Sequence, residues 1–176
     1  VGSEMCIRDR ECKVKLNPNI QNNDGNTPLH IACNINKSIF VTSLLRVFKD
    51  DINPNIQNVK GETPLHYAIL KNYKSCYILL LNDDNVNPNI RNVNGETPLH
   101  YAVEKNDVDI VTNYLKNKKV NPNIRNVKGE APLHYAARKE CWYSNWAAIS
   151  AGTCYYDKNF LRLLEDERTD PNIKNK

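Results

Sequence analysis

The tetrapeptide Thr-Pro-Leu-His occupies residues 27–30, recurs at 63–66 and 97–100, and returns with one change as Ala-Pro-Leu-His at 131–134. The copies are 36, 34 and 34 residues apart, and a glycine precedes each copy by two positions. Self-similarity at a fixed period of this size is typical of a stacked array in which each repeat is one supersecondary unit. The sequence therefore predicts a single elongated domain.

Each copy of this stretch carries the signals of a helix N-terminus. Thr63 suits the N-cap, and Pro64 suits the first helical position, where its missing N–H group leaves no hydrogen bond unmade. We predict a first helix of about nine residues. A second helix is indicated by an apolar stripe that starts at Phe40 and recurs from Cys76 and Ile110, and we expect it to be buried against neighbouring helices. A glycine-containing turn then leads to the next copy, so the unit is hairpin, helix, turn, helix.

The bulk composition excludes several classes of protein. The chain has 176 residues, of which 40% are hydrophobic and 25% charged, and its net charge of +4 is spread without long runs of one sign. The support for nucleic-acid binding is therefore weak. The longest apolar run, Cys76–Leu81, is far shorter than the roughly 20 residues of a membrane-spanning helix.

The residues that usually carry chemistry are confined to the repeat. All four histidines lie in the Thr-Pro-Leu-His column, and no serine or cysteine recurs beside them as a nucleophile. Each unit contributes one glycine, so no phosphate-binding loop is present. The six cysteines form neither a zinc motif nor a disulfide framework. We expect no enzyme, cofactor, metal site or catalytic residue, and an intracellular protein, cytoplasmic with the nucleus left open.

The segments NNDGNTPLHIA, NVKGETPLHYA, NVNGETPLHYA and NVKGEAPLHYA resemble the ankyrin-repeat signature. The resemblance covers about residues 12–173. It implies an all-α solenoid of stacked helix-turn-helix units joined by β-hairpin-like loops, which holds other proteins on its concave face. We place the units at about 21–54, 57–88, 91–122 and 125–171, with partial units at both ends of what we expect to be an excerpt of a longer array. Residues 1–10 are set aside as a leader or scar.

The resemblance also implies where a partner binds. The hairpin-tip positions of this expected surface are Asn23, Asp24, Asn26, Val59, Lys60, Glu62, Val93, Asn94, Glu96, Val127, Lys128 and Glu130. Its first-helix positions are Asn34, Ile35, Leu70, Lys71, Glu104, Lys105, Arg138 and Lys139. Within this set the valines, the glutamates and the lysines each form a column along the array, so we expect apolar, acidic and basic stripes.

The repeats depart from the family pattern in two regions. The family has a left-handed glycine after the second helix; Lys119 and Arg168 lie near that position here, and we expect their turns to be loose. In the fourth unit, Ala131 replaces the capping threonine, and Asn159 occupies a position that is apolar in the other units. We therefore predict that the fourth unit frays first.

The fourth unit also contains an insertion at about 141–155. It carries Trp142 and Trp146, which either project as an aromatic contact site or fold back over the core of this unit. Cys141 and Cys154 bracket the insertion, and we expect both to be unpaired thiols.

Three hypotheses for function follow. The first is a non-enzymatic, monomeric module that binds a protein or peptide. The second is a structural spacer in a larger protein, because the hairpin tips are nearly identical. The third, binding of nucleic acid by the lysine column, has the least support. The resemblance also leaves open hydroxylation of Asn55, Asn89 and Asn123, which match the site that asparaginyl hydroxylases modify in some ankyrin proteins.

Overall fold

The computed structural model describes residues 16–143 and 158–172, and for residues 139–143 it describes the backbone alone. This part of the chain contains helices and turns and no strand. The helices, in chain order, are α1 (Pro28–Asn34), α2 (Ser38–Val47), α3 (Pro64–Leu70), α4 (Lys74–Leu81), α5 (Pro98–Glu104), α6 (Val108–Lys116), α7 (Pro132–Tyr143) and α9 (Lys158–Glu165). The prediction of an all-α solenoid is confirmed.

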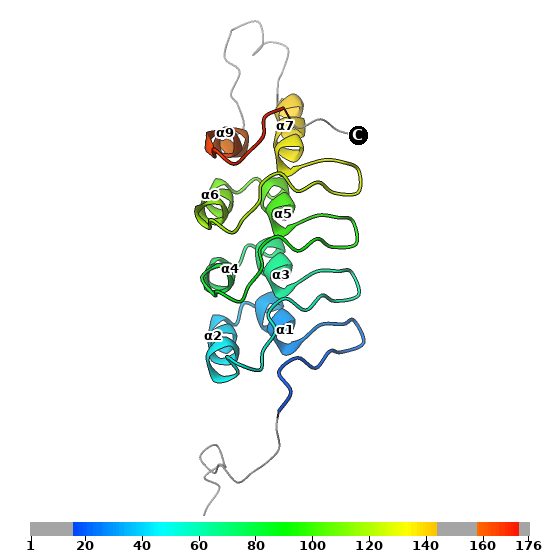
Figure 1. The fold of residues 1–176 in the computed structure, drawn as a ribbon, viewed down its shortest axis with the longest axis vertical. Coiled ribbons are helices and arrows are strands. Elements are labelled where there is room, and N and C mark those ends of the chain that lie inside the picture. Colours follow the sequence, from blue (N-terminus) through cyan, green and yellow to red (C-terminus); the bar gives the residue numbers. More distant parts are fainter. Residues whose placement is uncertain (1–15, 144–157, 173–176) are drawn as a thin grey trace, which may run out of the picture.

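The helices form two layers (Figure 1). One layer stacks α1, α3, α5 and α7, and the other stacks α2, α4, α6 and α9. The loops that precede the first-layer helices project from the opposite side of that layer as a row of extensions (Figure 1). Each helix contacts its partner in the same unit and its counterpart in the next, so the core runs along the whole array.

The Thr-Pro-Leu-His stretch starts each helix of the first layer as predicted. Thr27, Thr63 and Thr97 are the N-caps of α1, α3 and α5, and a proline follows each of them. These three helices have seven residues each, fewer than the expected nine. They are shorter because asparagines in the left-handed conformation, Asn36, Asn72 and Asn106, turn the chain into the second helix, with φ of 57°, 56° and 59°.

The prediction of loose turns at Lys119 and Arg168 is wrong. Among the non-glycine residues that the structure describes, Asn36, Asn72 and Asn106 alone have a positive φ. The chain therefore reverses direction before the second helix, and no left-handed residue is needed after it.

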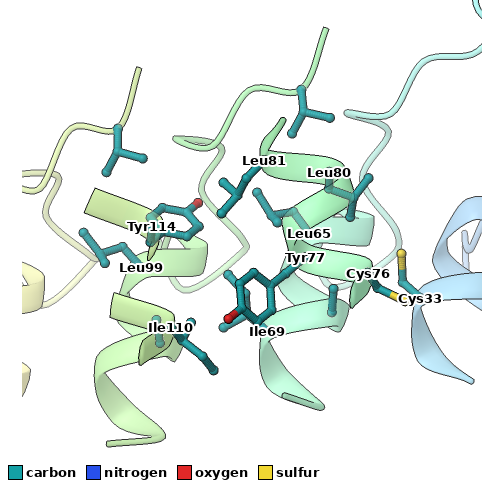
Figure 2. Close-up of a cluster of buried hydrophobic side chains, with 14 of the residues drawn as sticks. Cys33, Leu65, Ile69, Cys76, Tyr77, Leu80, Leu81, Leu99, Ile110 and Tyr114 are labelled. Atoms are coloured by element: carbon teal, nitrogen blue, oxygen red, sulfur yellow. The ribbon is translucent and has the colours of Figure 1, made fainter. Parts of the chain in front are cut away.

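Apolar side chains from both layers meet between neighbouring units (Figure 2). Leu65 of α3 and Leu99 of α5 are fully buried with Ile110 and Tyr114 of α6. The Tyr114 hydroxyl donates to the carbonyl of Pro88 at 2.6 Å, which satisfies its one polar group. Phe40 differs from this pattern and from our expectation, because its side chain is 62% exposed.

Asn159 is buried, although it is polar. Its Nδ2 atom donates to Oδ1 of Asn106 in the preceding turn at 2.6 Å. Cys76 makes the equivalent contact between the second and first units, with its Sγ atom 3.6 Å from Oδ1 of Asn36. A hydrogen bond thus takes the place of apolar packing at this position. That the fourth unit frays first stays a prediction.

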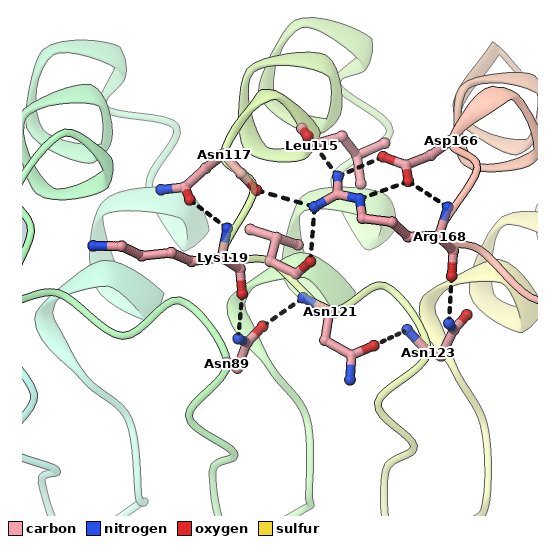
Figure 3. A network of polar contacts seen from close by, with 9 residues as sticks. Asn89, Leu115, Asn117, Lys119, Asn121, Asn123, Asp166 and Arg168 are labelled. Carbon is pink, nitrogen blue, oxygen red and sulfur yellow. Dashed lines mark hydrogen bonds and ion pairs between the residues drawn. The ribbon is translucent and has the colours of Figure 1, made fainter.

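Asparagine side chains join each inter-unit connection to the next (Figure 3). Nδ2 of Asn89 donates to the carbonyl of Lys119 at 2.6 Å, and its Oδ1 accepts the N–H of Asn121 at 2.8 Å. The same two bonds are made to the following connection by Asn19, Asn55 and Asn123. Each amide therefore has both polar atoms bonded to backbone of the next unit. The hydroxylation of three of these residues stays a prediction.

Several expectations lie outside the described residues. They concern residues 1–10, most of the insertion at 141–155 with Trp146 and Cys154, and the side chains of Lys139, Cys141 and Trp142. The insertion's first three residues are the end of α7, so this helix continues into the insertion.

Candidate protein-binding face

Three exposed valines lie at the tips of successive turns, which we call the fingers (residues 58–61, 92–95 and 126–129). Val59, Val93 and Val127 are 65%, 65% and 67% exposed. Their N–H groups donate to carbonyls of the preceding turn, at 3.0 Å to Asp24, 3.1 Å to Lys60 and 2.9 Å to Asn94. These bonds hold the fingers side by side and keep the valines in register at the surface.

The glycine of each finger permits this close approach. Gly61 has a φ of +72°, which is strained for other residues. A Cβ atom added to it would lie 2.7 Å from the backbone nitrogen of Val93 in the next finger. The stacking of backbone on backbone therefore requires glycine here.

The expected acidic stripe is wrong as a surface feature. The side chain of Glu62 is buried at 7% exposure, Asn26 at the same position of the first unit is also buried, and Glu96 and Glu130 are half-buried. These carboxylates point into the array because hydrogen-bond donors surround them there.

A tyrosine of the next unit is one of these donors. The Tyr101 hydroxyl donates to Oε1 of Glu62 at 3.1 Å, and Tyr135 makes the same bond to Glu96 at 2.6 Å. Nδ2 of Asn92 donates both to Glu96 at 3.3 Å and to the Tyr101 hydroxyl at 2.9 Å. The asparagine, glutamate and tyrosine columns thus form one network that braces the fingers against the first-layer helices.

The electrostatic consequences follow from burial. Burial, together with the nearby Glu62 carboxylate, raises the pKa of Tyr101. Burial alone would raise the pKa of Glu96, but the hydrogen bonds from Tyr135, Asn92 and Asn94 together lower it. Glu96 is therefore ionised near neutral pH and held within the stack, where a partner cannot contact it freely.

Sequence reasoning missed the role of the tyrosines and of the finger asparagines. The signal was present, because Asn58, Asn92 and Asn126 recur with the period of the array, as do Tyr67, Tyr101 and Tyr135. A column of the same polar residue in every unit indicates a bond between units.

The histidine column is part of the same scaffold. In His30, the Nδ1 atom accepts the N–H of Thr27 at 3.0 Å, and Nε2 contacts the carbonyl of Glu62 in the next unit at 3.0 Å. His66 and His100 repeat both contacts. Burial lowers the pKa of all three, to about 4 for His66. None of these rings is open to a substrate.

The first-layer helices contribute exposed residues at their C-terminal ends. Ile35, Lys71 and Lys105 are the C-cap residues of α1, α3 and α5 and are exposed. Arg138 of α7 is also exposed, pairs with Glu130 and lies 5.2 Å from the centre of the Tyr135 ring. Asn34 and Leu70 are half-buried, and Glu104 is exposed.

The exposed charges of this face are mainly basic. Lys60 and Lys128 lie beside the tip valines, and Lys71 and Lys105 lie at the helix ends. The exposed carboxylates among the expected positions are Asp24 and Glu104. With Glu62 buried, the surface is an apolar ladder between lysines.

The described residues offer neither a metal site nor a membrane-spanning helix. They contain no group of three or more His, Cys, Asp or Glu residues able to hold a metal ion. Within the same residues, every helix is too short or too polar to cross a membrane. Cys33 and Cys76 are buried free thiols, and burial raises the pKa of both.

Comparison with known proteins agrees with the geometry. A family model of three ankyrin repeats matches residues 10–92, and a family model of many ankyrin repeats matches residues 79–136. The chain belongs to the ankyrin-repeat family. This ankyrin-repeat chain finds no match in a search of curated proteins.

Among solved structures, the ankyrin-repeat chain is similar to the ankyrin repeat domain of Bcl-3, which is described as a unique member of the IκB protein family. The TM-score is 0.69 at 24% sequence identity, over 92% of this chain and 64% of that one. At this identity the likeness shows the shared fold alone. Ankyrin repeats are protein-interaction modules, and that general role applies to this array.

Proposed function

We propose that the array binds a protein or an extended peptide along the face formed by the finger tips and the C-terminal ends of the first-layer helices. The observation that carries this proposal is the ladder of Val59, Val93 and Val127, which is exposed in three consecutive fingers. Backbone hydrogen bonds within each finger and to the preceding turn fix the finger backbones, so a partner meets a rigid surface and little ordering entropy opposes binding.

The chemistry of the face indicates the chemistry of the partner. Apolar side chains of a ligand would cover the valines, and its carboxylates would lie near Lys60, Lys71, Lys105 and Lys128. Repetition of the same tip residues favours a ligand that is itself extended, because each finger offers an equivalent contact.

The direct test uses the array as bait for cross-linking and quantitative mass spectrometry. Wild-type bait is compared with Val59→Ser, Val93→Ser and Val127→Ser combined. A matched control, Val47→Ser with Leu161→Ser and Leu164→Ser, removes exposed apolar side chains from second-layer helices. We expect the finger variant to lose its partner by more than about tenfold and the control to retain it. Equal capture by both variants would contradict the proposed face.

The basic positions provide a second test. Lys71→Glu, Lys105→Glu and Lys139→Glu combined should weaken the same partner and leave the thermal unfolding midpoint unchanged, since Lys71 and Lys105 are exposed. An unchanged affinity would remove the lysines from the site.

The same experiment distinguishes the spacer and nucleic-acid hypotheses. A spacer would capture no partner at low-micromolar concentration. Binding of nucleic acid would instead weaken steeply with added salt as counterions are released.

A further inference from the structure

The second layer of helices carries an apolar groove, remote from the fingers. It lies between α2 and α4 and has a volume of about 470 Å³. Ile39 and Thr42 of α2 line one wall, and Ile78 and Leu79 of α4 line the other, with Lys74 and Ser75 at the rim.

The wall from α4 is apolar because of its unusual sequence. The run Cys76–Leu81 places six apolar residues in succession on one short helix. Four of them are buried in the core, so Ile78 and Leu79 remain at the groove, half-buried. The corresponding residues of α6 are the polar Thr112 and Asn113. Packing between repeats therefore does not require an apolar residue at either position.

The wall from α2 is also apolar at a position where the other units are polar. Ile39 is 80% exposed, and its counterparts are Ser75, Asp109 and Lys158. Ser75, Asp109 and Lys158 are exposed, although the helix that carries each of them packs against the second-layer helix of the preceding unit. A further repeat stacked on α2 would bury Phe40, whose counterparts are buried, and would leave Ile39 exposed.

Basic residues mark one end of the groove. Lys74 begins α4, and Lys37 is the N-cap residue of α2, directly before the groove. Neither lysine takes part in an ion pair within the described ranges 16–143 and 158–172. The two helix N-termini add partial positive charge at the same end. The matching end of α6 instead carries Asp107 and Asp109.

We propose that the groove between α2 and α4 is a second docking site, which binds an amphipathic helix of a partner protein with acidic residues beside its apolar face. A helix can place side chains at i, i+3, i+4 and i+7 between two neighbouring helices, where Ile39, Ile78 and Leu79 offer apolar contact. Carboxylates of this helix pair with Lys37 and Lys74. This site is independent of the finger face, so the array can hold two partners at once.

The test uses a synthetic peptide about four turns long, built from Leu, Ala and Glu with leucines on one face, and a matched peptide with Lys in place of Glu. Isoleucine-methyl NMR spectra of the protein are recorded during each titration. We expect the acidic peptide to shift the methyl signals of Ile39 and Ile78 with saturation, and the basic peptide to leave them unchanged.

Variants make the assignment specific. Ile39→Glu should weaken binding of the acidic peptide by about tenfold or more, and Lys74→Glu by a smaller factor that shrinks further at high salt. Both side chains are exposed, so folding should be unaffected. The control Lys105→Glu reverses a lysine on the finger side of the array and should leave the affinity unchanged.

Four results would overturn the proposal. They are no shift at Ile39 and Ile78, an equal response to the basic peptide, shifts that follow protein concentration without peptide, and shifts produced only by anionic lipid vesicles. The third result would assign the groove to a second copy of this chain, and the fourth to a membrane surface.

Discussion

The imidazole of each buried histidine is held as the neutral tautomer that carries its proton on Nε2. Nδ1 of His66 accepts the N–H of Thr63 at 3.0 Å and therefore needs a free lone pair, while Nε2 faces the carbonyl of Glu96 at 3.2 Å. Protonation at Nδ1 would set two N–H donors against each other and break the bond that caps the helix, while Nε2 would still donate to the carbonyl of the next unit. One residue type thus couples the start of a helix to the stacking of units.

Mild acid should therefore destabilise the array. The pKa of His66 falls from 6.5 to about 4 on folding because of burial, so the unfolded chain binds a proton first. Stability from this group is complete above pH 6.5 and is lost as the pH falls from 6.5 towards 4. At pH 5 the loss from His66 is about 2 kcal/mol. Urea unfolding midpoints measured from pH 7.5 to 5 should decrease, and His66→Gln should reduce this slope. A midpoint that is flat over this range would contradict the assignment.

The N-cap of α7 is the weakest of the four. Ala131 lacks the hydroxyl group of its counterparts, although its N–H still donates to Nδ1 of His134 at 3.1 Å. Ala131→Thr should restore the missing bond and raise the unfolding free energy by about 1 kcal/mol in urea titrations. The reverse change at an intact cap, Thr97→Ala, should lower it by a similar amount. No gain from Ala131→Thr would show that the cap bond contributes little in this unit.

The last helix is fixed to the array by its C-terminal turn. The guanidinium of Arg168 donates to the carbonyls of Leu115 at 2.6 Å, Asn117 at 3.2 Å and Val120 at 2.9 Å (Figure 3). Asp166 orients it through a second set of bonds. Arg168 thereby satisfies carbonyl groups at and just beyond the C-terminal end of α6, which otherwise lack partners within the helix. We had expected this residue to loosen its turn, and it instead joins the fourth unit to the third.

Replacing Arg168 should release α9. Arg168→Lys keeps the charge but cannot reach three carbonyls at once, so we expect α9 amides to exchange faster with solvent by about tenfold or more. Protection in α3 should not change. Arg162→Lys is the matched control, because Arg162 is exposed and pairs only with Glu165 of the same helix among the described ion pairs. Equal effects of the two changes would contradict the anchoring role.

The whole array is held by contacts between neighbouring units. The asparagine bonds, the finger backbones and the histidine contacts each join one unit to the next and none reaches further. Stability should therefore follow a nearest-neighbour rule, in which a local defect weakens adjacent units and leaves distant ones intact.

Gly61→Ala tests this rule. Its Cβ atom would press on the next finger and its positive φ would be strained, so the unfolding free energy should fall by about 1 kcal/mol or more. Hydrogen exchange should accelerate in α3 and α5 while α9 keeps its protection. Uniform acceleration across every helix would show that the array unfolds as one unit.

The sequence alone determined the fold. The period of Thr-Pro-Leu-His, the proline after each cap and the apolar stripe of the second helix are local signals, and local signals specify where helices begin and which sides they bury. For this reason a stacked array of helix pairs was predictable from the printed residues, and the resemblance to ankyrin repeats added the solenoid and the exposed valine ladder.

Only the tertiary structure decided the direction of the polar side chains. Glu62 occupies a finger position that suggests exposure, yet Tyr101, 39 residues later, holds its carboxylate inside. The sequence predicts a loose turn at Arg168 and a weak position at Asn159, and it gives no sign of their partners 48 and 53 residues earlier in the chain, at Val120 and Asn106. A charged or amide group faces inward when a partner offsets its desolvation, and the stacking of units brings that partner into place.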